Sequence, residues 1–274
     1  MKDGFLRVAV ATPEIRVADP SHNAGQIIRL AGEMPPDTAL AVFPELCVTG
    51  YTCGDLFLQP LLLREAEQAV VRILDASLSA DALLVVGVPV PCGASLYNCA
   101  AVCQHGKLLG LVPKSHIPSY SEYYEGRHFT PADDTCRDIF YAGQDTILSR
   151  SLLFVCRNIP DFRVGVEVCE DLWVADQPSC VGRCHRHCQS LRERRIGRKG
   201  RIPPSDRDDP VGPPVLRVCV CRRGRGGIDG RSRIFRAEYD RGKRRNPCGE
   251  RAVHHRATLY RGRSGPSGVR AAAP

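Results

Sequence analysis

Two uninterrupted apolar runs most constrain what this 274-residue chain can fold into. Residues 39–43 (Ala-Leu-Ala-Val-Phe) and 82–90 (Ala-Leu-Leu-Val-Val-Gly-Val-Pro-Val) contain no polar side chain. A strand with one face in water would alternate apolar and polar residues, so strands made from these runs need cover on both faces. The two runs therefore predict a sheet that is enclosed on both sides.

Amphipathic segments alternate with these runs along the chain. Residues 23–34 place apolar side chains at helical spacing and stop before Pro35-Pro36. Residues 56–78 repeat Leu, Ala, Val and Ile at intervals of three and four, which predicts one long helix. Further strands are expected at residues 6–12, 153–155 and 164–168, and a β-hairpin with its turn at 104–107. This order predicts a covered α/β sheet rather than an all-helical or all-β domain.

The charge of the chain is divided very unevenly. Residues 1–179 contain 13 Lys and Arg against 22 Asp and Glu, whereas residues 180–274 contain 25 against 8. The second segment has only 15 Leu, Ile, Val and Phe in 95 residues, too few for a charged chain to bury a core. Val215 to Cys221 is its one sustained apolar stretch. We therefore expect a folded domain at residues 5–178 and a disordered tail at 179–274.

Three polar residues follow apolar runs: Glu45, Lys114 and Cys169. Together they would suit acyl transfer, in which a thiolate attacks, a carboxylate moves the proton and an ammonium stabilises the oxyanion. Taken singly, each has a plainer interpretation. Glu45 could lie at a helix N-terminus, Lys114 could be a solvated loop charge, and Cys169 could be a small buried hydrophobe.

The surrounding motifs resemble the nitrilase, or carbon–nitrogen hydrolase, superfamily. They are Phe43-Pro44-Glu45-Leu46 with Thr49-Gly50-Tyr51, Pro113-Lys114-Ser115 with Pro118-Ser119-Tyr120, and Val166 to Asp171. More narrowly, they are similar to the amino-terminal glutaminase domains of glutamine-dependent NAD synthetases, given the Tyr-x-Glu-Tyr-Tyr-Glu run at 120–125 and the Cys-Glu-Asp order. The three regions occur in the family order.

This resemblance implies an αββα sandwich and a hydrolytic reaction. It assigns Glu45 as general base, Lys114 as oxyanion-stabilising cation and Cys169 as nucleophile. Tyr120, Glu122 and Glu170 match positions at the substrate, and Glu122 is the counterpart of a second glutamate beside the substrate amide. The implied reaction hydrolyses the amide of glutamine through a glutamyl thioester. It needs no cofactor or metal, and members of the family commonly form homo-oligomers.

The chain departs from the family pattern in two ways. It lacks a Ser-Gly-Gly-x-Asp-Ser type loop, so we expect the ATP site and the synthetase domain that would receive the ammonia to be missing from it. The motif pattern also stops near residue 179, before the later strands that family members contribute to the sandwich. An incomplete sandwich leaves an unpaired sheet edge, so we expect weak activity or none.

Three interpretations of the basic tail remain open. Its arginines suit a nucleic-acid-binding arm, although few aromatic residues lie between them. Cys180, Cys184, His185, His187 and Cys188 suggest zinc, but their spacing fits no standard finger. The third interpretation is a shifted reading frame. Residues 182–192 can be encoded so that dropping one base yields AGATVIVNLSA, which looks like the missing family segment. We favour this frameshift over either binding function.

Composition also bears on cellular location. The N-terminus shows no signal-peptide pattern and no apolar run reaches the length of a membrane span. Of the fourteen cysteines, the eight before residue 180 lie mostly in apolar runs at irregular spacings, unlike a disulfide framework. A cytoplasmic protein is expected.

The functional alternatives are another nitrilase-type amidase acting on a small amide, and an inactive scaffold with a basic nucleic-acid-binding tail.

Overall fold

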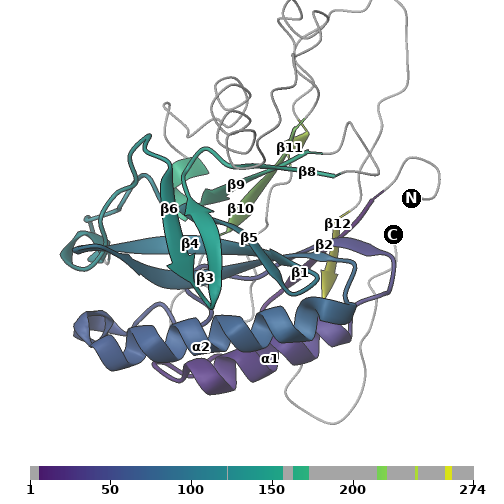
Figure 1. The fold of residues 1–274 in the computed structure, drawn as a ribbon, viewed down its shortest axis with the longest axis horizontal. Coiled ribbons are helices and arrows are strands. Elements are labelled where there is room, and N and C mark those ends of the chain that lie inside the picture. The colour runs from purple at the N-terminus through teal and green to yellow at the C-terminus, as the bar shows by residue number, and fades with distance from the viewer. Residues whose placement is uncertain are drawn as a thin grey trace, which may run out of the picture.

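The computed structural model describes residues 6–121, 123–156 and 163–172, together with the backbone of three strands at 215–220, 238–239 and 257–260. It shows three layers, which are a pair of helices, a large sheet and a smaller sheet (Figure 1). These layers and the mixed α/β composition confirm the expected fold class of a nitrilase-type sandwich. Among the residues described, no helix is both long and apolar enough to cross a membrane.

The described elements alternate as the sequence indicated. The helices are α1 (Pro20–Gly32) and α2 (Pro60–Ala76), and the 3₁₀ turns are η1 (Gly54–Leu58), η2 (Ser77–Ser79), η3 (Glu125–Arg127) and η4 (Cys169–Leu172). The strands are β1 (Arg7–Ala11), β2 (Thr38–Val42), β3 (Leu83–Cys92), β4 (Ser95–Gln104), β5 (Lys107–Pro113), β6 (Arg137–Tyr141), β7 (Gln144–Leu148), β8 (Leu153–Val155), β9 (Arg163–Val168), β10 (Val215–Val220), β11 (Glu238–Tyr239) and β12 (Ala257–Tyr260).

The strands form two sheets. The large sheet has the order β12-β1-β2-β3-β4-β5-β7-β6, and the small sheet has the order β11-β10-β9-β8. Strands β12, β1, β2 and β3 pair in parallel, and the β3-β4-β5 meander is antiparallel. In the small sheet β10 pairs in parallel with β9. Strands β10, β11 and β12 come from the basic tail. The other residues of this tail, for which disorder was predicted over 179–274, lie outside the described part of the chain.

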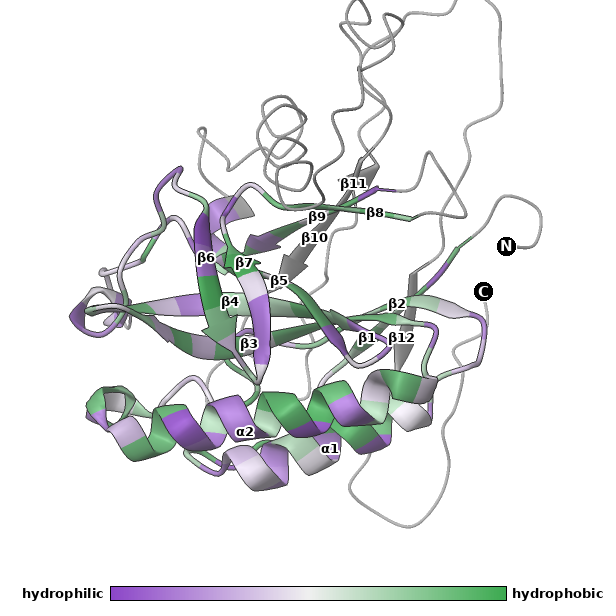
Figure 2. Ribbon diagram, viewed as in Figure 1, coloured by the Kyte–Doolittle hydropathy of each residue, from purple (hydrophilic) through white to green (hydrophobic). Residues whose placement is uncertain are grey.

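Two apolar cores explain why the central strands are apolar on both faces. The first core lies between the helices and the large sheet and includes Ile27 of α1, Ile73 of α2 and Val86 of β3. The second core lies between the sheets and includes Val85 of β3 and Val166 of β9. Adjacent residues of β3 therefore enter different cores, as expected for a covered strand. Figure 2 shows the resulting pattern, with mostly hydrophobic central strands and helices of mixed hydropathy.

The long helix predicted at residues 56–78 was wrong as a single element. The structure has η1, then α2 from Pro60, then η2. Pro60 is the first residue of α2, where its missing N–H leaves no hydrogen bond unmade and its fixed φ suits a helix start. Pro60 could not continue a helix from η1, so the apolar periodicity extends over two separate helical elements.

The hairpin between β4 and β5 was predicted, and the hairpin between β6 and β7 was missed. Strands β4 and β5 join through His105 and Gly106, whose φ angles of 49° and 72° are the two positive values of a type I′ turn. Strands β6 and β7 join in the same way through Ala142 and Gly143, with φ angles of 51° and 74°. That second hairpin lies at the sheet edge, and its short, half-polar strands gave too little pattern to predict.

The loop after β2 is fixed tightly on β3. Phe43 N donates to Val85 O at 2.9 Å before the loop, and Val48 N donates to Gly87 O at 3.1 Å after it. Gly87 lies directly under the loop, and a Cβ atom there would be 2.3 Å from Leu46 N and 2.5 Å from Pro44 O. These neighbours are backbone atoms that cannot rotate away. Glycine at position 87 is therefore required for the loop to lie where it does.

We predict that Gly87→Ala will lower the free energy of unfolding by about 3 kcal/mol, because the added methyl group overpacks a rigid site. Urea unfolding followed by circular dichroism measures this loss.

Gly25→Ala is the matched control, because no atom lies within 4 Å of a Cβ at that position in α1. Alanine favours a helix over glycine, so this variant should gain about 0.5–1 kcal/mol. Equal stability of the Gly87 variant and the unaltered protein would show that the loop can move away from β3.

Candidate active site

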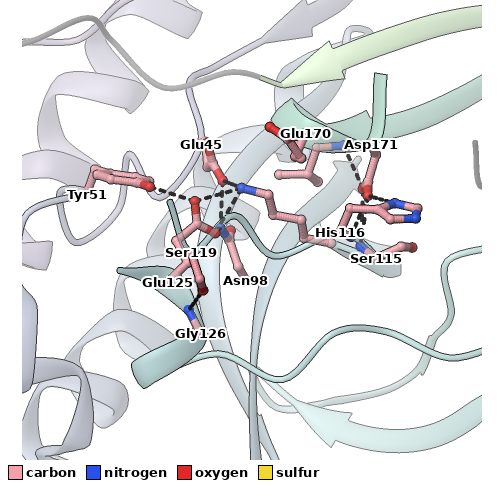
Figure 3. Close-up of polar contacts among 12 residues, drawn as sticks. Glu45, Tyr51, Asn98, Ser115, His116, Ser119, Glu125, Gly126, Glu170 and Asp171 are labelled. Atoms are coloured by element: carbon pink, nitrogen blue, oxygen red, sulfur yellow. Dashed lines mark hydrogen bonds and ion pairs between the residues drawn. The ribbon is translucent and has the colours of Figure 1, made fainter. Parts of the chain in front are cut away.

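Three chain segments that the sequence singled out meet at one end of the two sheets. Glu45 follows β2, Lys114 follows β5, and Cys169 follows β9. The side chains of Glu45 and Lys114 are buried, with exposures of 2% and 0%. The interpretation of Lys114 as a solvated loop charge is therefore wrong. Figure 3 shows Glu45 with its polar neighbours, among them Asn98 and Glu125.

The ammonium of Lys114 lies between two carboxylates. Its Nζ donates to Glu45 Oε1 at 2.7 Å and to both oxygens of Glu125 at 2.8 Å. Glu125, in η3, is itself only 4% exposed. Burying an ammonium costs several kcal/mol unless opposite charges and hydrogen bonds compensate, and here two carboxylates supply both. Lys114 therefore joins the end of β5 to the loop after β2 and to η3.

Two neutral side chains complete this cluster. Asn98 of β4 donates through Nδ2 to Glu45 Oε1 at 2.7 Å and to Glu125 Oε2 at 3.3 Å. The Tyr51 hydroxyl donates to Glu125 Oε1 at 2.6 Å. The second oxygen of Glu45, Oε2, is buried and accepts no hydrogen bond within the described part of the chain. One oxygen of Glu45 is thus held by Lys114 and Asn98, and the other has no hydrogen bond within the described part of the chain.

Burial and charge act in opposite directions on the two ionisable groups of the predicted triad. Burial raises the pKa of Glu45, and the nearby Glu125 carboxylate raises it further, while Lys114 lowers it in part. For Lys114, burial alone would lower the pKa, but Glu45, Glu125 and Cys169 raise it well above its ordinary value. A carboxylate with a raised pKa is a stronger proton acceptor. Lys114 keeps its positive charge.

Cys169 is the first residue of η4 and forms a sharp turn directly after β9. Its φ angle is 48°, in the left-handed region that a residue with a Cβ rarely adopts. The residue is partly exposed and packs against the core between the sheets. The thiol also exerts an electrostatic influence that raises the pKa of Lys114. Cys169 therefore lies just after the end of β9 and is partly exposed, unlike the small buried hydrophobe of the alternative interpretation.

The predicted substrate residues are only partly described. The Tyr120 hydroxyl, on an exposed side chain, is 3.1 Å from both carboxylate oxygens of Glu170, the residue after Cys169. Glu122 lies outside the described residues, so its predicted place beside the substrate amide stays a prediction. Glu125, three residues later, contacts Lys114 instead. The position of Glu122, eight residues after Lys114, favoured it as the second glutamate of the site. Glu125, which belongs to the same tyrosine-rich run, was therefore overlooked.

Asn98 was also missed, although the sequence carried a signal for it. It is the one amide side chain among the apolar residues 96–103, and a lone buried amide needs a polar partner. Across the ladder, its neighbour Cys99 pairs with Pro113, which brings Asn98 beside Lys114. Among the described residues no group of three or more His, Cys, Asp or Glu could hold a metal ion. The Cys and His cluster at 180–188 lies outside them.

We predict that Lys114→Met will lower the free energy of unfolding by about 3–5 kcal/mol, because it leaves two buried carboxylates without a cation. Without Lys114, these carboxylates bind protons more tightly in the folded than in the unfolded state. Their destabilising effect therefore grows as pH rises, and the loss should be larger at pH 8 than at pH 5. Urea unfolding at both pH values tests this.

Lys107→Met is the matched control, because Lys107 is an exposed lysine at the start of the same strand. It should change stability by less than about 0.5 kcal/mol at either pH. A loss at Lys114 that is independent of pH would contradict the electrostatic explanation.

Comparison with known proteins agrees with this geometry. The carbon–nitrogen hydrolase family profile matches residues 7–180. The glutamine-dependent NAD(+) synthetase of Mycobacterium tuberculosis H37Rv is 40% identical over 177 residues, which are 64% of this chain and 26% of that protein. The protein of the same name from Aquifex aeolicus is 29% identical over 172 residues, 63% of this chain and 27% of that protein. The chain thus spans about a quarter of the length of these relatives.

Solved structures show the same likeness. The glutamine-dependent NAD(+) synthetase from Cytophaga hutchinsonii superimposes with a TM-score of 0.53 at 25% identity, covering 59% of this chain and 27% of that one. The enzyme from Acinetobacter baumannii gives a TM-score of 0.50 at 26% identity, covering 61% of this chain and 28% of that one. With its family match over most of the chain, its sandwich layers and its buried Glu45–Lys114 pair, this chain belongs to the carbon–nitrogen hydrolase family.

Proposed function

We propose that this chain hydrolyses the side-chain amide of glutamine, with Cys169 as nucleophile, Glu45 as proton acceptor and donor, and Lys114 as the cation that stabilises the oxyanion. The observation that carries the proposal is the buried contact between Glu45 and Lys114 at the rim where the Cys169 turn lies. A lysine and a glutamate this deeply buried are rare unless they are paired, and such pairs occur often at sites of chemistry.

Each step of the proposed reaction uses Glu45, Lys114 or Cys169. Glu45 accepts the thiol proton through Oε2, its oxygen without a hydrogen bond among the described residues, while the sulfur of Cys169 bonds to the amide carbon. The carbonyl oxygen becomes an oxyanion, which the Lys114 ammonium stabilises. Glu45 then gives the proton to the departing nitrogen. Ammonia is released, and a thioester on Cys169 remains. Water, deprotonated by Glu45, hydrolyses the thioester to glutamate and restores the thiol.

Glutamine is the proposed substrate for two reasons. Relatives that are 40% identical over this domain are named for their dependence on glutamine. The Tyr120 and Glu170 pair beside Cys169 also supplies a hydroxyl and a carboxylate, which suit a charged amino acid better than a small neutral amide. We include Glu122 in the same proposed set of substrate contacts.

The proposal extends to the fate of the ammonia. The names of the relatives support a synthetase partner that uses ammonia in NAD synthesis, and ATP would bind to that partner. The hydrolytic step itself uses only side chains and water. We further propose a cytoplasmic location, where glutamine is available. Because the family similarity ends near residue 180, we expect slow turnover by this chain, with acylation of Cys169 easier to detect than steady release of glutamate.

We predict that a glutamine analogue with a diazoketone in place of the amide will label the chain once, at Cys169. Mass spectrometry of the digested protein locates the label, and excess glutamine should slow the labelling by competition. Cys169→Ala should abolish both the labelling and any release of glutamate, because it removes the proposed nucleophile.

Cys136→Ala is the control, since Cys136 is another partly buried free thiol before β6. It should be labelled as the unaltered protein is. Labelling that persists in the Cys169 variant would refute the assigned nucleophile. If a small aliphatic amide slows the labelling of Cys169 and glutamine does not, the result would favour the alternative function, a nitrilase-type amidase that acts on a small amide.

A further inference from the structure

Asp171 is a buried carboxylate with an unusual number of backbone partners. It is 1% exposed and lies in η4, two residues after Cys169. Its Oδ1 accepts from Ser115 N at 3.0 Å, from His116 N at 2.8 Å and, with the ring proton on Nδ1, from His116 Nδ1 at 2.9 Å. Its Oδ2 accepts from Val168 N at 3.3 Å and lies 3.2 Å from Ser115 N. Figure 3 shows Asp171 against Ser115 and His116.

These partners flank the two reactive residues. Ser115 and His116 directly follow Lys114, and Val168 directly precedes Cys169. The backbone of Lys114 is otherwise fixed on the large sheet side, where its N–H donates to Asn98 O at 2.8 Å and its carbonyl accepts from Ala132 N at 2.9 Å. Lys114 is thus anchored in one sheet and Cys169 at the end of the other. The carboxylate of Asp171 is bonded to both segments.

We propose that Asp171 is a positioning residue, whose carboxylate holds the turn carrying Cys169 at a fixed separation from the loop carrying Lys114. The inference rests on the proposed roles of those two residues. Asp171 touches neither the thiol nor the ammonium in any described contact. It acts through the backbone on each side of them.

The turn at Cys169 explains why such a hold is needed. A non-glycine residue at φ 48° is held there only when surrounding contacts determine its conformation. The bond from Val168 N back to Asp171 resembles half of a capping box, in which the third residue of a helix accepts from the residue that caps it. The same side chain therefore closes the turn and ties it to the Lys114 loop.

Asparagine in place of Asp171 should break this double hold. Asparagine has the same shape but one acceptor oxygen, and its amide group is a donor. Whichever way the amide is turned, it would present N–H groups either to Val168 N or to the N–H groups of Ser115 and His116. One of the two segments loses its acceptor, so the thiol and the ammonium can move apart.

The test is the rate at which iodoacetamide alkylates Cys169, followed by mass spectrometry of its peptide across a range of pH. This reaction requires a thiolate but no glutamine. In Asp171→Asn we expect the rate at pH 7.5 to fall about tenfold or more, because a thiol with a higher pKa is less ionised at that pH. The pH of half-maximal rate should move upward, because the thiol would lose the nearby ammonium. The variant should still unfold cooperatively.

Asp134→Asn is the matched control, since Asp134 is an exposed aspartate that pairs with Arg150. It should leave the alkylation rate and its pH dependence unchanged. Asp171→Glu keeps the charge but shifts the carboxylate by one methylene, so we expect it to fold and to be alkylated slowly. It decides the question if the Asn variant does not fold.

Three outcomes would overturn the inference. The first is an unaltered alkylation rate and pH profile in a folded Asp171 variant. The second is loss of folding in both Asp171 variants, since Asp171 would then support the fold rather than the site. The third is slowing without any change in the pH profile, which a general loosening would produce. Failure of the proposed function would look different. Cys169 of the unaltered chain would then be alkylated no faster than Cys136.

Discussion

The structure depends above all on one buried ammonium. Lys114 is fully enclosed, and its Nζ is shared between Glu45 and Glu125, so three separate chain segments are held by a single point charge. An ion in a protein interior is stable only while its partners stay in place, because loss of either would leave uncompensated charge. The loop after β2, the end of β5 and η3 are therefore fixed relative to one another by electrostatics as well as by the sheet.

The composition of this cluster also suits proton transfer. With all groups ionised, Glu45, Glu125 and Lys114 carry one excess negative charge in a buried place. That excess favours the uptake of one proton, and burial raises the pKa of Glu45. Glu125 offsets the influence that Lys114 would otherwise have on its neighbour. The cluster thus keeps a positive charge on Lys114 beside a carboxylate whose raised pKa favours the uptake of a proton.

The sequence predicted the parts of the fold that follow from burial. Apolar runs with no polar alternation gave the covered strands β2 and β3, and the polar residues at the ends of strands gave Glu45, Lys114 and Cys169. The helix boundary at Pro60 was missed because hydrophobic periodicity continues through a proline that restarts the helix. Glu125 and Asn98 were missed for another reason. Their importance comes from contacts between segments distant in the chain, such as Asn98 with Glu45, 53 residues apart. The local pattern marks Asn98 as a lone amide in an apolar run, but it does not identify the partner.

The left-handed conformation of Cys169 has a consequence for how this domain can change. Only glycine adopts such a φ without steric cost, and a side chain with a Cβ raises the energy of the folded state by about 1–2 kcal/mol. Replacement of the cysteine by glycine would relieve that strain and remove the thiol. A population selected for thermal stability alone would therefore lose this thiol early, and persistence of cysteine at this turn would indicate selection for the reactivity proposed for it.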